Sequence, residues 1–74
     1  MLPQGLRDQL FHIEVSLSVT GRRLRAVCLD AATREDILYV TARAEMAFDL
    51  AHPTAAQREL DRLKAIARRW GAER

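Results

Sequence analysis

Hydrophobic residues between Thr33 and Ala51 predict a helix with two apolar sides, because they recur at about 100° of rotation per residue. One side carries Ile37, Val40, Ala44, Ala47, Phe48 and Ala51, and the far side carries Leu38, Tyr39, Ala42, Met46 and Leu50. A helix that is apolar most of the way round is buried in its working state. In a chain of 74 residues, another protein surface must cover the second side. We therefore expect the far side to be an interface.

Residues 11–19 alternate between apolar and polar side chains. The apolar positions are Phe11, Ile13, Val15, Leu17 and Val19. A period of two, with aromatic and β-branched residues, is typical of a strand with one buried face. A helix with Leu6, Leu10, Ile13 and Leu17 on one side is the competing interpretation, but it leaves Phe11, Val15 and Val19 outside that side. We prefer the strand.

A turn at Thr20-Gly21 would lead into a second strand over residues 22–29, because glycine adopts the positive φ that tight hairpins need. The resulting register pairs Leu17 with Leu24 and Ile13 with Cys28, so that apolar side chains share one face. The sequence therefore predicts a β-hairpin over residues 11–29, after an irregular lead over residues 1–10.

The C-terminal part of the chain predicts a second helix over residues 55–70. Its apolar side consists of Ala56, Leu60, Leu63, Ile66, Ala67 and Trp70. Thr33 and Thr54 are expected to cap the two helices, over residues 33–51 and 55–70, and Gly71 suits the position after the second. The short joint at His52-Pro53 predicts an antiparallel pair. The expected fold is a single small α+β domain over residues 1–74, ββαα in order and dimeric. Because a two-stranded sheet is unstable alone, its apolar face must pack on the helices or its edges must pair with another copy.

Composition favours association as the reinforcement of this small domain. A chain of this length buries a modest fraction of its surface and is marginal alone. Its single cysteine excludes an internal disulfide, which leaves oligomerisation or complex formation. No apolar run reaches the ~18 residues of a membrane span, and the N-terminal residues do not resemble a signal peptide. We expect a cytoplasmic protein that does not interact with membranes.

The candidates for chemistry are few. Cys28 and His12 would suit a nucleophile and its base, but the hairpin register places them on opposite faces and predicts that Cys28 is buried. Neither histidine lies near Cys28 or the other histidine at the spacing of known zinc sites. The three glycines form no phosphate-binding loop. We therefore expect no catalytic residue, no metal, no cofactor and no enzymatic activity.

Basic residues gather on the outward side of the last predicted helix. They are Arg58, Arg62, Lys64, Arg68 and Arg69, and Arg23 and Arg25 add to them from the outer face of the hairpin. A solvated helix face explains them, since cations suit a helix C-terminus; phosphate binding is the alternative. A strand followed by two helices loosely resembles the ribbon-helix-helix repressors over residues 22–69, in element order alone, and that resemblance implies DNA binding through the ribbon.

Two functional hypotheses follow. The first is a small non-catalytic interaction module, a regulator or inhibitor, which docks as a homodimer or on a larger protein through the interface residues on the far side of the first helix. The second is a small DNA- or RNA-binding regulator that uses the arginines of the hairpin and the basic helix. The net charge of +2 is too small to decide between the two hypotheses.

Overall fold

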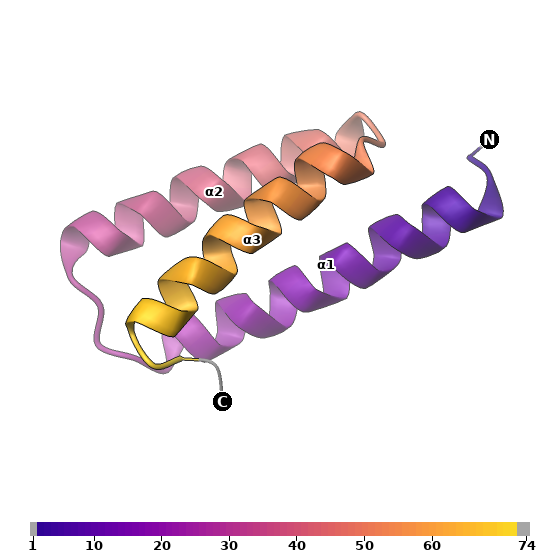
Figure 1. Cartoon of the computed structure of the whole chain (residues 1–74). Coiled ribbons are helices and arrows are strands. Elements are labelled where there is room, and N and C mark those ends of the chain that lie inside the picture. The colour runs from indigo at the N-terminus through magenta and orange to yellow at the C-terminus, as the bar shows by residue number, and fades with distance from the viewer. Residues whose placement is uncertain (1, 73–74) are drawn as a thin grey trace.

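The computed structural model describes residues 2–72 and consists of three helices (Figure 1). They are α1 (Gln4–Arg25), α2 (Ala31–Asp49) and α3 (Pro53–Arg69). No strand occurs within the described residues, so the predicted α+β fold with an N-terminal β-hairpin is wrong. The protein is all-helical there, and the resemblance to the ribbon-helix-helix repressors loses the ribbon on which it depended.

The N-terminal half folds as a helix because its inward positions follow a spacing of three and four residues. Leu10, Ile13, Leu17, Thr20 and Leu24 form this line, and all of them are buried or half-buried. That spacing keeps side chains on one face of a helix. The alternation between residues 11 and 19 arises because Phe11 and Val15 add exposed apolar side chains on the other side of the same helix. The competing helical interpretation was the correct one.

The predicted turn at Thr20-Gly21 is also wrong, since both residues lie within α1. The Thr20 hydroxyl donates to the carbonyl of Ser16 at 2.8 Å, which satisfies a buried side chain within the helix. Among the described residues, Gly71 is the glycine with a positive φ, 67°. It follows α3, in the place that suits a helix end.

Both later helices start two residues before the predicted positions, at caps other than Thr33 and Thr54. The Asp30 carboxylate accepts from the backbone N–H of Thr33 at 2.8 Å and caps α2. The Nδ1 atom of His52 accepts from the N–H of Ala55 at 3.1 Å and caps α3. Pro53 opens α3, where its fixed φ suits the first turn and its missing N–H costs nothing.

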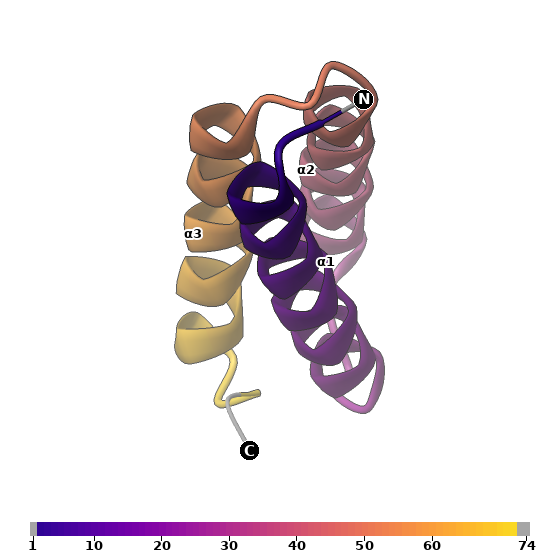
Figure 2. The same ribbon diagram turned by 90° about the vertical axis from the view of Figure 1, so that its right-hand side faces the viewer.

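Helix α3 packs against both α2 and α1, whereas α1 and α2 scarcely touch. In the view of Figure 1, α3 lies between the other two helices, and in the turned view of Figure 2, α1 lies in front, between α3 and α2. The two buried clusters show this shared role. Leu63 of α3 packs with Leu24 of α1 and Val40 of α2, and Leu60 packs with Ile13 and Ala47 nearer the other end. The Cα extents are 41 × 22 × 14 Å, and the smallest of them exceeds the ~5 Å Cα diameter of a single helix, so the three helices do not lie in one flat layer.

Candidate interaction groove

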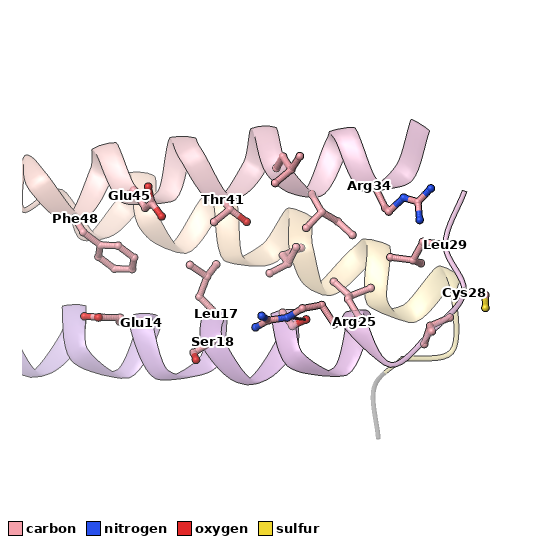
Figure 3. Close-up of a pocket in the computed structure, with 16 residues that line it drawn as sticks. Glu14, Leu17, Ser18, Arg25, Cys28, Leu29, Arg34, Thr41, Glu45 and Phe48 are labelled. Atoms are coloured by element: carbon pink, nitrogen blue, oxygen red, sulfur yellow. Dashed lines mark hydrogen bonds between the residues drawn. The ribbon is translucent and has the colours of Figure 1, made fainter. Parts of the chain in front are cut away.

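A groove with a volume of about 830 Å³ runs between α1 and α2, with Leu63 of α3 at its base. It exists because each outer helix packs on α3 and neither covers the other. Apolar side chains dominate its lining: Leu17, Leu24, Val27, Leu29, Ile37, Leu38 and Phe48. Figure 3 shows Leu17 and Phe48 directed into the space between the two helices. An apolar groove of this size along two helices suits a helical or flat apolar partner better than a small polar substrate.

The charged residues of the groove are separated by sign. Glu14 of α1 and Glu45 of α2 lie toward one end, and Arg25 of α1 and Arg34 of α2 lie toward the other (Figure 3). Within residues 2–72, none of the four takes part in an ion pair. The groove therefore presents an acidic end, an apolar middle and a basic end to whatever lies over it.

The groove side of each outer helix has its own line of residues spaced by three and four. On α1 the line is Glu14, Ser18, Gly21 and Arg25; on α2 it is Arg34, Leu38, Thr41, Glu45 and Phe48. This is the spacing at which a helix presents a seam to another helix. In α1 the buried line and the groove line are adjacent, so the helix has one seam for α3 and a second seam without a partner among residues 2–72.

The structure divides the interface predicted from the sequence into separate parts. Leu38 lies on the edge of the groove and is 70% exposed. Tyr39, Met46 and Leu50 are 61%, 62% and 75% exposed, and none of them lines the groove. Ala42 is also exposed. We call Tyr39, Met46 and Leu50 the outer face of α2.

A buried carboxylate joins the outer face to α3. Glu59 is 3% exposed and accepts from Arg43 Nε at 3.4 Å and from Arg62 Nη1 at 3.2 Å. Arg43 also donates to the Tyr39 hydroxyl at 3.3 Å, and its guanidinium carbon lies 5.6 Å from the centre of the Tyr39 ring. The hydrogen bonds to Tyr39 and Glu59 raise the pKa of Arg43 above its usual value. This network holds α2 on α3.

The predicted basic surface is divided as well. The arginine-bearing hairpin does not exist, since Arg23 and Arg25 lie on the last turn of α1. Arg23 borders a depression of about 200 Å³ with Lys64 and Arg68 of α3, whereas Arg25 lines the groove. Arg62 is engaged by Glu59, and the exposed Arg58 and Arg69 lie on α3 outside both hollows. The structure thus unites only Arg23, Lys64 and Arg68.

Cys28 is exposed, which corrects the prediction that it is buried. It lies in the loop between α1 and α2, at the end of the groove (Figure 3), whereas His12 is exposed on α1. Within the part of the chain that the structure describes, no three His, Cys, Asp or Glu side chains come together as a metal site requires. None of the described helices is long and apolar enough to cross a membrane.

Sequence reasoning missed the groove and three of its charged residues, Glu14, Arg34 and Glu45, and it named Arg25 only as part of a basic surface. The signal was present in the spacing of the second line on α1, but the strand interpretation of residues 11–19 does not bring all of these positions onto one side. No protein family, curated protein or solved structure matches this chain. The function must therefore be inferred from the surface of the molecule itself.

Proposed function

We propose that the protein is a small non-catalytic interaction module that acts by self-association or by docking on a larger protein. The observation that carries this proposal is the apolar surface of α2. Leu38 at the groove, and Met46 and Leu50 on the outer face, are each more than three-fifths exposed. Exposed apolar patches of this kind mark protein interaction sites on soluble proteins.

The shape of the molecule supports the same proposal. Helices α1 and α2 each pack on α3 and scarcely on each other, so each leaves apolar side chains without a neighbour among residues 2–72. Another protein surface over these side chains would reinforce a domain that is marginal for its size.

The experiment compares the wild type with Leu38→Asp, which changes the groove, and Met46→Asp, which changes the outer face. Light scattering gives the mass of the purified proteins, size-exclusion chromatography of native extract gives the size of the assembly in cells, and circular dichroism verifies the fold. We expect an assembly larger than the 8.4 kDa chain, which at least one substitution breaks. A folded monomer in both settings, unchanged by either substitution, would contradict the proposal.

Nucleic-acid binding is the second candidate, and the convergence of Arg23, Lys64 and Arg68 on one depression favours it. None of these three has an ion pair with a carboxylate among residues 2–72. Three phosphate contacts would give a slope of about −2.7 in log affinity against log salt, at ~0.9 per contact. A gel-shift series with the triple alanine variant, and Arg58→Ala as the control, tests this; no binding at low salt removes the candidate.

A further inference from the structure

The geometry points to a second copy of this chain as the occupant of the groove between α1 and α2. The two grooves face each other across a two-fold axis that lies at right angles to their length, so that α1 meets the partner's α1 in the opposite direction and α2 meets the partner's α2. This inference rests on the proposed function, since it names one partner for an interaction module. Its basis is the charge distribution, the seams and the surface area.

The charges of the groove select this orientation. With the axis across the groove, Glu14 of one copy meets Arg25 of the other, and Glu45 meets Arg34. With the axis along the groove, α1 would face the partner's α2, and like charges would meet at both ends. Like-charge contacts across an interface are unfavourable and exclude wrong arrangements. With the axis across the groove, which we call the crossed orientation, each of these like-charge contacts is replaced by a contact between opposite charges.

The spacing along the helices agrees with a single axis. Glu14 and Arg25 are eleven residues apart, and so are Arg34 and Glu45, a span of about 16.5 Å at 1.5 Å per residue. Equal spans on both helices allow one two-fold operation to bring both pairs together, as an isologous interface requires. Near the middle of the α1 seam lie Ser18 and Gly21, whose small side chains permit a close approach of two helices.

The exposed area of the chain matches what such a dimer needs. The accessible surface is 5293 Å², whereas a compact monomer of 8.4 kDa is expected to expose about 4,600 Å². The excess of about 700 Å² is close to the ~800 Å² per partner that a standard interface buries.

The first experiment reverses the charges in sedimentation velocity with purified full-length protein. We expect Glu14→Arg and Arg25→Glu each to raise the dissociation constant of the dimer about tenfold, because each converts two attractive pairs into repulsive ones. The double variant E14R/R25E restores the pairing and should return the constant to within about threefold of the wild type. An unchanged or tighter dimer with E14R alone would overturn the crossed orientation.

The second experiment locates the middle of the interface by cross-linking. In a Cys28→Ser background, mild oxidation of Leu38→Cys should give a covalent dimer, because position 38 lies near the axis. Met46→Cys in the same background is the matched control and should remain monomeric under denaturing conditions. Efficient cross-linking through position 46, with none through position 38, would overturn the inference.

The outcomes separate this inference from the broader proposal. A dimer that Met46→Asp breaks and E14R leaves intact would overturn the groove interface and would support an interaction module that uses the outer face of α2. A purified monomer that is part of a larger assembly in native extract would overturn self-association and would support docking on another protein. A monomer in both settings overturns both proposals.

Discussion

Leu63 and Leu38 allow the stability of the domain to be separated from its assembly. Both side chains line the groove, but Leu63 is 1% exposed at its base and Leu38 is 70% exposed at its edge. Leu63→Ala should therefore lower the free energy of unfolding of the monomer. Leu38→Ala should leave that free energy almost unchanged and weaken the dimer.

The size of the effect follows from burial. Leu63→Ala removes three buried carbons, worth ~0.8 kcal/mol each, and leaves a cavity between three helices. Leucine truncations in cores cost about 2–5 kcal/mol. Because the groove lies beside Leu63 and lets neighbours relax or water enter, we expect about 3 kcal/mol, in the lower half of that range. Leu38→Ala should change the stability of the monomer by less than about 0.5 kcal/mol.

Urea unfolding measures this difference, with circular dichroism and the fluorescence of Trp70, the single tryptophan, as two probes. If the free energy of unfolding falls by ~1 kcal/mol per molar urea, as in small proteins, the loss of about 3 kcal/mol in Leu63→Ala lowers the urea midpoint by about 3 M. The measurement belongs at a concentration where the wild type is monomeric, since dimerisation adds apparent stability. A loss below about 1 kcal/mol for Leu63→Ala, or equal losses at both positions, would refute this description of the core.

Three further predictions concern single residues. Glu59→Gln should cost about 1 kcal/mol in urea unfolding, because it weakens charge-assisted hydrogen bonds but leaves Arg43 and Arg62 able to reach water; no loss would contradict the buried network. Hydrogen bonding from Thr33 lowers the pKa of Asp30. The contribution of Asp30 to stability is therefore complete above its unfolded pKa, near 3.8, and is lost as the pH falls through the lower folded pKa. Asparagine caps without titrating, so the thermal midpoint of Asp30→Asn should fall less steeply with falling pH than that of the wild type; parallel plots of midpoint against pH would contradict this. Gly21→Ala should stabilise the monomer by about 0.5–1 kcal/mol, because Gly21 lies within α1 and nothing lies within 4 Å of the added carbon. Gly71→Ala should destabilise it, because the φ of Gly71 is +67°; the opposite order of thermal midpoints would argue against these two backbone conformations.

The sequence predicted helices over residues 33–51 and 55–70, and the structure has α2 and α3 over nearly the same positions. Hydrophobic spacing and Pro53 were sufficient there, because those segments support one periodicity only. Residues 11–19 support two, since Ile13 and Leu17 belong to both the alternating pattern and the helical line. The choice between them depends on whether α3 covers the helical line, and this tertiary packing is not a local property of the segment.

The candidate site shows the same division. Met46 and Leu50 are exposed because α2 has more apolar surface than its packing on α3 can cover, and the pattern in residues 33–51 indicated that surplus. The groove exists because α1 and α2 both pack against α3 and scarcely against each other. Glu14 and Arg34 are far apart in the sequence, and only this packing of the helices brings their charges onto one surface.

Sedimentation equilibrium of the wild-type chain, over concentrations from about 1 μM to several hundred μM, tests the central claim most directly. The account predicts a reversible rise in mass from 8.4 kDa to twice that value, without larger species, because a two-fold interface closes on itself. A mass that stays at 8.4 kDa across the whole range, for a chain that remains folded, would contradict it.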